Sequence, residues 1–317
     1  MKTYISDLVL NEEVTSFFMV VDVPQVRKNK RDQDYLCLKL TDKTGEVEAR
    51  VWDVPPGLDV NSLGKSIVKV RGQVGSWNDQ VQVTITQIRK VNGEDAIDMA
   101  DFFERSERDP EDMYVDLRER LSIHLTNEYV ASLLYKVLAE NAQEFKKAPA
   151  AKSIHHNYLG GLLEHVLSLC DTCISLSTRY ELDLDLMLAA CVLHDIGKIR
   201  ELSYSMGTSY TVEGTLIGHI SIGMGMVDRA IRELDEVRDF PANLKMAIMH
   251  LIASHHGLLE WGSPRVPLMR EAVAFHLADM LDSKMATCAR ILKAGVSDEG
   301  LSEWSKEMGG PLWRMPE

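Results

Sequence analysis

The sequence lacks any apolar run approaching the roughly eighteen residues that a membrane-spanning helix requires. Met1–Val20 carries Asp7, Glu12 and Glu13, where a secretion signal would be basic and then apolar. No low-complexity tract is present, and the composition is ordinary for a globular protein. We therefore expect a cytoplasmic protein with no membrane partner, and its 317 residues are enough for two domains.

Cysteine is scarce, and its count of five is odd. The cysteines are scattered through apolar segments, as expected for reduced thiols in a core. Cys170 and Cys173 match the C-x-x-C spacing, but no second pair follows and the segment has a helical pattern. A redox or zinc role for this pair is therefore disfavoured.

Basic residues are outnumbered by acidic ones, 35 to 48, so the net charge is −13. This argues against a general nucleic-acid coat. Met1–Asp95 holds 13 Lys and Arg against 14 Asp and Glu, whereas the remaining residues hold 22 against 34. A polyanion would therefore meet the N-terminal part first, and would need metal ions to approach the rest.

The N-terminal third has the alternating, β-branched and aromatic pattern of β-strands. The predicted strands are Thr15–Val23, Tyr35–Leu40, Glu46–Trp52, Ile67–Val74 and Val81–Val91. We expect a basic loop at Arg27–Arg31, a hairpin turn at Asp42–Gly45 and a break at Gly75–Asp79. Strands at this spacing predict a small all-β Greek-key barrel over residues 1–95.

The stretch Leu40–Asp53 resembles the hairpin of strands 2 and 3 in OB-fold domains that bind nucleic acid. Such domains stack the bases of a single strand on aromatic side chains and contact phosphates with basic ones. For any single residue, a place in the core or on a solvated face is the simpler explanation. The candidate contacts are Tyr35, Arg50, Trp52, Lys69, Arg71 and Trp77, with Lys28, Lys30 and Arg31 in the basic loop.

An acidic linker over residues 96–112 precedes a helical remainder at 113–317. Its predicted helices are Tyr114–His124, Asn127–Phe145, Leu159–Tyr180, Leu184–His194, His219–Leu234, Asn243–Ser254 and Arg270–Ala294. Only Ser203–Val212 shows a weak strand pattern. The second domain is therefore expected to be all-α.

The predicted helix that ends at His194 breaks a local rule. Asp195 follows at its tail and faces the negative end of the helix dipole, which is unfavourable. Gly197 is expected in the left-handed conformation that stops a helix. A metal cation that both His194 and Asp195 bind would offset the cost, so the segment predicts a functional site.

Other histidines and acids occur at comparable positions in the helical part. His165 lies on an amphipathic helix, His219 near a helix start, His255 and His256 at a helix end, and Asp279 within an apolar helix. A buried carboxylate must be paired or coordinate a metal. Singly, each histidine is best explained as a core or surface residue, but packing alone does not explain the ordered set.

This set resembles the HD superfamily of metal-dependent phosphohydrolases, over about Tyr158–Ala294. The resemblance implies that His165, His194, Asp195 and Asp279 hold a first metal. Asp195 would bridge to a second metal completed by His219 and His255, with His255 preferred to His256. Mixed imidazole and carboxylate ligands suit Mn, Fe, Co or Zn better than Mg.

With two metals, a bridging hydroxide can attack phosphorus while the metals neutralise the developing charge. Lys198, about one turn after Asp195, would contact a phosphate oxygen or protonate the leaving oxygen. The alternative is an ordinary helix C-terminal lysine that interacts with the helix dipole. The sequence does not decide between the two.

An OB-like domain followed by an HD domain resembles the YhaM family of 3′–5′ exoribonucleases, over nearly the full length. Ile154–His165 and Ser254–Pro264 carry the same resemblance. It implies manganese-stimulated removal of 5′-mononucleotides from a single-stranded 3′ end, RNA being favoured over DNA. His155, His156 and His256 would line the pocket, or His155 and His156 would only pack a helix start. A homo-oligomer is left open.

Three other functions stay open. A cyclic-dinucleotide phosphodiesterase of the HD-GYP kind would have glutamate where Gly257 follows the paired histidines. A nucleotide phosphohydrolase would not need an OB domain. A non-catalytic single-strand binder would have no reason to retain the buried acids and imidazoles.

Overall fold

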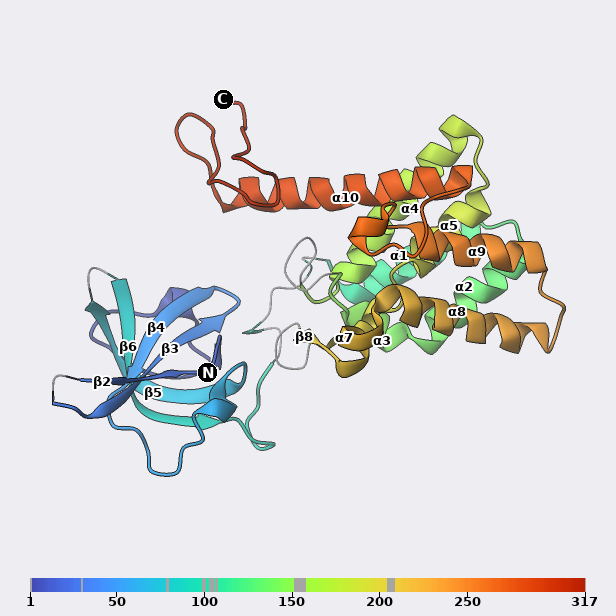
Figure 1. Ribbon diagram of the computed structural model, residues 1–317. Helices are drawn as coiled ribbons and strands as arrows, with labels where there is room; N and C mark the ends of the chain where they lie inside the picture. The colour runs from blue at the N-terminus through green and yellow to red at the C-terminus, as the bar shows by residue number, and fades with distance from the viewer. Residues whose placement is uncertain are drawn as a thin grey trace. The chain divides into compact units, whose positions relative to one another are not determined.

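The computed structural model describes residues 2–29, 31–77, 80–98, 101–102, 106, 108–150, 158–203 and 209–316. The chain forms two compact units. One, here the β unit, is Met1–Glu104 with 205–207; the other, the helical unit, is Arg105–Tyr204 with Thr208–Glu317. Strands dominate the first and helices the second (Figure 1). None of the described helices is long and apolar enough to cross a membrane.

The β unit is built on a six-stranded sheet. Its strands are β1 (Glu13–Val20), β2 (Gln25–Lys28), β3 (Asp34–Asp42), β4 (Gly45–Val51), β5 (Ile67–Trp77) and β6 (Gln80–Lys90), with short helices η1 (Ile5–Asp7) and η2 (Asn61–Leu63). The strand order is β1-β5-β6-β4-β3-β2, and β1 also pairs with β3. Among the strand pairs that the structure describes, only β4 and β6 run parallel. The five strands other than β2 are thus joined in a closed cycle of pairings.

Alternation along the strands places one face of the sheet in a core. Phe18, Leu36, Leu40 and Val68 are fully buried there. Gly72 lies at a register shift between β5 and β6, where a Cβ atom would stand 2.4 Å from the carbonyl oxygen of Thr84. The prediction of an all-β N-terminal domain is confirmed.

Part of the basic loop is a strand, so the prediction of a loop over its whole length was wrong. Arg27 and Lys28 belong to β2 and pair with β3. The chain reverses just after them, because the Asn29 side-chain oxygen accepts hydrogen bonds from the backbone N–H groups of Arg31 (2.8 Å) and Gln33 (3.1 Å). The break predicted over Gly75–Asp79 starts later than expected, since β5 continues to Trp77 and β6 begins at Gln80.

Within the described residues the helical unit is all-α, as predicted, apart from one small two-stranded pairing and two isolated bridges, Leu301–Trp313 and Ser305–Gly310. Its helices are α1 (Pro110–His124), α2 (Glu128–Glu140), α3 (Ala142–Lys147), α4 (Gly161–Tyr180), α5 (Leu184–Leu193), α6 (Lys198–Glu201), α7 (Val212–Ile217), α8 (His219–Asp235), α9 (Ala242–Ser254), η4 (Leu259–Trp261) and α10 (Arg270–Ala294). The strands β7 (Leu202–Ser203) and β8 (Ser209–Tyr210) pair within Ser203–Val212 and its N-terminal neighbour, where the residues show a weak strand pattern. The single helix predicted over Asn127–Phe145 is two helices, because Asn141 has a non-helical backbone and its amide donates to the Val137 carbonyl (2.7 Å).

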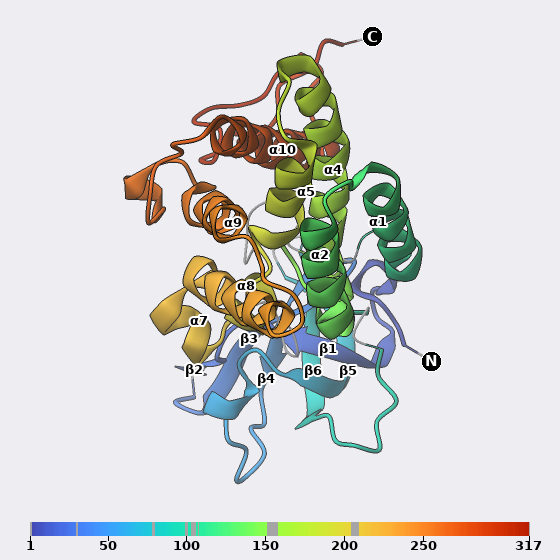
Figure 2. The ribbon, with the colours of Figure 1, turned by 90° about the vertical axis from the view of Figure 1, so that its right-hand side faces the viewer.

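Helices α4 and α5 lie side by side in the middle of the helical unit (Figure 2). Every residue of α5 from Met187 to Leu193 is buried. This helix contacts α2, α9 and α10 as well as α4. Side chains at the end of α5 and on the inner face of α4 are therefore removed from bulk water.

Candidate metal centre and nucleic-acid interface

Three separate elements bring His165, His194 and Asp279 together. His165 is on α4, His194 ends α5, and Asp279 is on α10. The Nε2 atom of His165 lies 3.4 Å from the Nε2 atom of His194 and 3.2 Å from the Oδ1 atom of Asp279. One donor atom of each residue lies within 4.8 Å of the others, close enough for one cation to contact all three.

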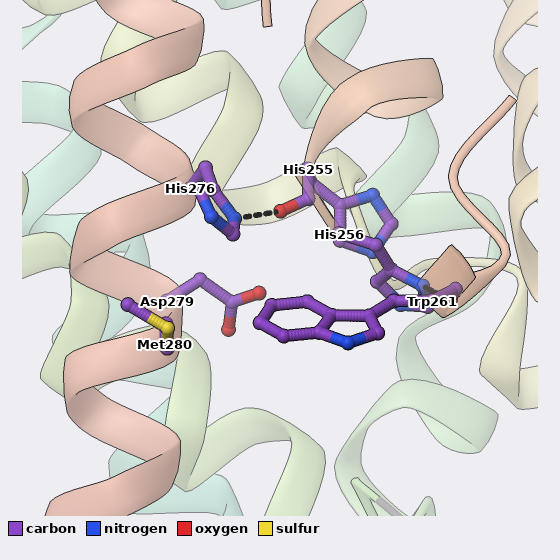
Figure 3. A pocket seen from close by; sticks show the side chains of 6 residues that line it. All are labelled: His255, His256, Trp261, His276, Asp279 and Met280. Atoms are coloured by element: carbon purple, nitrogen blue, oxygen red, sulfur yellow. Dashed lines mark hydrogen bonds between the residues drawn. The ribbon is translucent and has the colours of Figure 1, made fainter. Parts of the chain in front are cut away.

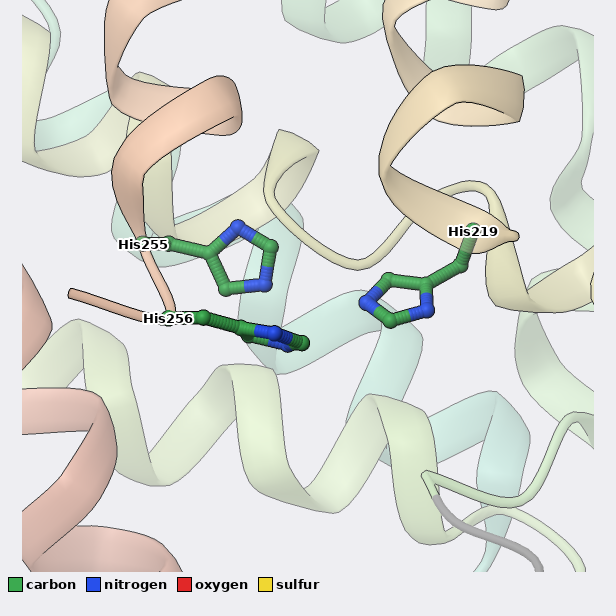
Figure 4. A group of neighbouring side chains, drawn as sticks. All are labelled: His219, His255 and His256. Carbon is green, nitrogen blue, oxygen red and sulfur yellow. The ribbon is translucent and has the colours of Figure 1, made fainter. Parts of the chain in front are cut away.

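A second group consists of His219, His255 and His256, whose imidazole rings turn toward one another (Figure 4). His219 is the first residue of α8, and the paired histidines follow α9. One nitrogen of each ring lies within 4.8 Å of the others. His255 is buried, whereas His256 is half-buried. The structure thus groups both paired histidines with His219.

Asp195 lies between the two groups, in the turn that joins α5 to α6. Its Oδ2 atom is 3.2 Å from Nε2 of His194. Its Oδ1 atom is 3.5 Å from Nε2 of His219 and 3.7 Å from Nε2 of His255. One carboxylate oxygen therefore faces each group.

Several polar atoms at this point have no protein partner. Among the described residues, four buried side-chain oxygen or nitrogen atoms make no hydrogen bond. Three of them are Asp195 Oδ1, His219 Nε2 and His255 Nε2. An unpartnered buried polar group costs about 1–3 kcal/mol. Three such atoms converging from three segments fit a divalent cation, and the mixed nitrogen and oxygen donors suit Mn, Fe, Co or Zn.

The histidine rings are oriented by hydrogen bonds from their other nitrogen. The Nδ1–H of His194 donates to the carbonyls of Ala190 and Cys191 (both 3.1 Å), and that of His255 donates to the Ile252 carbonyl (2.7 Å). Donation from Nδ1 fixes the tautomer in which Nε2 carries a free lone pair. Both rings therefore present Nε2 to the centre.

Two carboxylates that were not predicted orient the other two rings. Glu201 accepts from the Nδ1–H of His219 (3.1 Å) and from its backbone N–H (2.9 Å). Asp282 accepts from the Nδ1–H of His165 (2.7 Å) and from the Ser168 hydroxyl. Asp282 lies three residues after Asp279 on α10, a spacing that could have indicated it. Glu201 has no comparable signal in the sequence.

Burial and neighbouring charge set the protonation of the centre. Burial raises the pKa of Asp195, but the Lys198 ammonium group and the adjacent His194 outweigh this effect and hold the pKa well below the usual range. Burial together with His194 lowers the pKa of His255 well below its ordinary value. An ionised carboxylate and a neutral imidazole are the forms that bind metal.

His165 differs, because two acids contact it. Burial lowers its pKa, but hydrogen bonds to Asp279 and Asp282 raise the pKa to about 9. For Asp279, burial raises the pKa, but the hydrogen bond with His165 outweighs this effect and the pKa lies below its usual value. Without a cation, the proton on His165 compensates the two carboxylates.

The turn after His194 contains Gly197 and Lys198, two residues singled out from the sequence. Gly197 is not left-handed, because its φ of −63° is helical, so that prediction was wrong. The glycine is needed for close approach instead: a Cβ atom would stand 2.0 Å from the His219 carbonyl oxygen. Lys198 places its Nζ 2.5 Å from Oδ2 of Asp195, so its ammonium group lies at the edge of the centre.

A cavity of about 260 Å³ opens beside the two groups. It is lined by His255, His256, Trp261, His276, Asp279 and Met280 (Figure 3). His276 donates from Nδ1 to the His255 carbonyl (2.9 Å). The predicted pocket residues His155 and His156 lie outside the described residues.

The β unit carries a second candidate site on its surface. Tyr35 and Trp52 are stacked, with ring centroids 4.6 Å apart and an angle of 23° between the planes. The Arg50 guanidinium lies 5.7 Å from the Trp52 ring and 5.3 Å from the Trp77 ring. A cavity of about 440 Å³ adjoins the stack and is lined by Lys28, Asn29, Arg31, Gln33, Tyr35 and Trp52.

Besides Arg50 and Trp77, the two predicted basic contacts on β5 also do not line this cavity. Arg71 is ion-paired with Glu13 (2.6 Å) on the neighbouring strand, and the Lys69 Nζ lies 4.0 Å from a carboxylate oxygen of Asp95. Both cations are therefore partly neutralised by acids. Lys30 lies outside the described residues.

A model of the HD domain matches residues 162–284. This stretch contains every residue of the two groups and Asp195. The chain therefore contains an HD domain, which indicates a metal-dependent phosphohydrolase and the binding of divalent metals.

Solved OB-fold structures are similar to the N-terminal part. The second OB-fold domain of replication protein A from Methanococcus maripaludis is 22% identical, covering 31% of this chain and 100% of that chain with a TM-score of 0.25. An OB domain from Methanosarcina mazei is 23% identical, covering 31% and 87% with a TM-score of 0.24. Both TM-scores are low, so the fold of the β unit rests on its own strand pairings.

Proposed function

We propose that the protein is a 3′–5′ exoribonuclease of the YhaM type, which hydrolyses single-stranded RNA from its 3′ end and releases 5′-mononucleotides. The observation that carries this proposal is Asp195, whose two carboxylate oxygens face two separate groups of metal-binding side chains within an HD domain. A carboxylate shared in this way is typical of two-metal phosphodiesterases.

His165, His194, Asp195 and Asp279 would hold one divalent ion, most suitably Mn²⁺. Asp195, His219 and His255 would hold the other, with His256 beside them. Bound ions would supply Lewis acidity and the nucleophilic water for attack on phosphorus. Glu201 and Asp282 hold two of the imidazoles in the ligating tautomer.

Lys198 would contact the phosphate of the substrate in addition to Asp195. Its ammonium group is held against Asp195 and is only partly buried. From there it can donate a hydrogen bond to a phosphate oxygen or a proton to the leaving oxygen. The lysine is thereby kept beside the group that bears the developing negative charge.

The β unit would hold the strand that the helical unit degrades. Stacked aromatics with nearby cations bind single strands with little sequence preference. Linking this surface to the helical unit raises the local concentration of strand at a site whose own net charge repels it. The β unit supplies attraction, and the helical unit supplies the chemistry.

Incubation with Mn²⁺ and oligonucleotides that have a free or a blocked 3′ end tests the proposal. We expect laddering from the free 3′ end of RNA and none from the blocked end, with a DNA strand as the comparison for sugar preference. Cleavage of only a cyclic dinucleotide or a free nucleotide would select the corresponding phosphohydrolase. Binding without any cleavage would select the non-catalytic single-strand binder.

A further inference from the structure

An indole is displayed beside the candidate metal centre, on the segment that follows the paired histidines. Trp261 ends the short helix η4 and is 51% exposed. What distinguishes this indole is its position, because it lines the same cavity as His255, His256 and Asp279. Figure 3 shows the ring extending from its loop toward Asp279 on α10.

The turn that carries this indole is held by hydrogen bonds, one of them from His256 of the second group of histidines. His256 donates from Nδ1 to the Trp261 carbonyl (2.9 Å), and Gly262 follows with a φ of +82°, which favours glycine. The buried hydroxyl of Ser263 then donates to the carbonyls of Ala253 (3.1 Å) and Arg265 (2.8 Å). The indole is therefore exposed but stands on an ordered turn.

The other side of the cavity is provided by α10, through His276 and Met280. Gly257 allows the loop to approach this helix, because a Cβ atom there would stand 2.2 Å from the His276 ring. His276 also donates to the His255 carbonyl (2.9 Å). The loop and α10 are thus joined at the end of the cavity, and the Met280 thioether faces the same space as the indole (Figure 3).

The cavity combines two chemistries over a short distance. His255, His256 and Asp279 supply metal-binding atoms, while Trp261 and Met280 supply an aromatic face and a polarisable thioether. A ligand that contacts both parts of the cavity would carry a metal-binding anionic group next to a planar ring, and for the proposed substrate these are the phosphate and the base. At about 260 Å³ the cavity is slightly smaller than typical drug-sized sites of ~300–1,000 Å³, so it suits a single ring system.

We infer that Trp261 and Met280 form a subsite for the nucleobase of the nucleotide whose phosphate is bound at the metal centre. The inference rests on the proposed function and adds a substrate-recognition element to it. Stacking on an indole is sequence-tolerant, because every base has a π face. We therefore expect the four nucleobases to bind with similar affinity.

The test compares 5′-AMP with ribose 5-phosphate, which carries the same phosphate without a base. Binding is measured by calorimetry with Mn²⁺ present and by quenching of tryptophan fluorescence. Wild-type protein should bind 5′-AMP roughly tenfold more tightly than ribose 5-phosphate. Trp261→Ala should remove this difference while leaving ribose 5-phosphate binding unchanged, and Trp261→Phe should retain most of it. Trp304→Ala, a change at an indole that is 65% exposed elsewhere in the unit, should have no effect.

The outcomes separate this subsite from the function on which it rests. Equal affinity of wild-type protein for the two ligands would overturn the subsite, as would equal loss of both ligands in Trp261→Ala. If RNA is still shortened from its 3′ end in either case, the proposed function stands without the subsite. Absence of Mn²⁺-dependent binding of either ligand, together with intact RNA, would reject both.

Discussion

The β unit and the helical unit present their candidate binding side chains to solvent in opposite ways. In the β unit, Trp52 is 40% exposed and Trp77 is 59% exposed, and the Arg50 guanidinium lies 5.7 Å and 5.3 Å from their rings. In the helical unit, His194 is 0% exposed and His255 is 2% exposed. Exposed side chains contact a nucleic-acid strand without losing much hydration. Buried metal-binding atoms, in contrast, gain a partner only when a cation is bound. The first arrangement is suited to reversible holding and the second to chemistry.

Charge follows the same division. Met1–Asp95 is nearly balanced, with 13 basic and 14 acidic residues, whereas the rest of the chain holds 22 against 34. A phosphate backbone is therefore repelled by the helical part unless metal ions are bound. Changes in one unit should accordingly affect holding, and changes in the other should affect turnover.

The largest difference between the effect on turnover and the effect on strand binding is expected from Asp195→Asn. The amide removes one of the two charged oxygens that face the two groups, so turnover should fall by roughly 10³-fold or more. Binding of a single-stranded oligoribonucleotide, measured by fluorescence anisotropy, should stay within about twofold of wild type. Asp239→Asn, at an exposed position, is the matched control. Equal loss of turnover and binding would show that the two units do not divide the work.

The converse change neutralises the basic segment of the β unit by replacing Arg27, Lys28, Lys30 and Arg31 with glutamine. If all four contact phosphates, affinity at physiological salt should fall by up to about 10²-fold, and each lost contact should lower the salt slope by ~0.7. Metal uptake by the helical unit should be unchanged. Anisotropy titrations between low and high salt measure both effects, with Lys90→Gln on the same unit as control. An unchanged slope would show that the segment does not contact the strand.

The fold class follows from patterns that act locally. The resemblance of the ordered set His165, His194, Asp195, His219 and Asp279 to the HD superfamily predicted which residues would meet. Alternation in the first third and helical periodicity afterwards predicted the two architectures. Such patterns work because burial of one face is decided within a few neighbouring residues. The grouping of distant residues followed only because the whole ordered set could be considered together.

The errors arise where a distant partner decides the outcome. Gly197 is required by the carbonyl of His219 rather than by a helix stop, and the Arg71 charge is taken up by Glu13, which is 58 residues away in the sequence. The short helices α6 and α7 contain too few residues to show a period. Glu201 is identified as a partner of His219 only when both are seen in space.

A smaller effect within the helical unit should come from Asp282→Asn. Loss of the carboxylate that orients His165 should weaken metal affinity by about 10–100-fold while the fold is retained. Because Asp282 helps to raise the pKa of His165 to about 9, metal binding by wild-type protein near neutral pH must displace the proton on His165.

Calorimetry in buffers of different ionisation enthalpy should therefore detect fewer protons released by this variant. Asp298→Asn, at an exposed position after α10, serves as the control. Unchanged metal affinity and unchanged proton release together would show that Asp282 is only a structural partner of Ser168.

The smallest effect is expected from Trp52→Ala, which tests whether the β unit only binds the strand and takes no part in the chemical step. Loss of a stacking ring should weaken binding of a single strand by roughly tenfold, since base stacking contributes about 1–3 kcal/mol per base. Tyr35 and Arg50 lose their partner in the same variant, so Trp52→Phe is needed to separate loss of the ring from loss of the indole. Turnover of an RNA at saturating concentration should be unaffected, because the strand then occupies the helical unit regardless of how the β unit holds it. A fall in saturated turnover equal to the fall in affinity would mean that Trp52 acts on the chemical step, and the contrast between a holding unit and a reacting unit would no longer describe this protein.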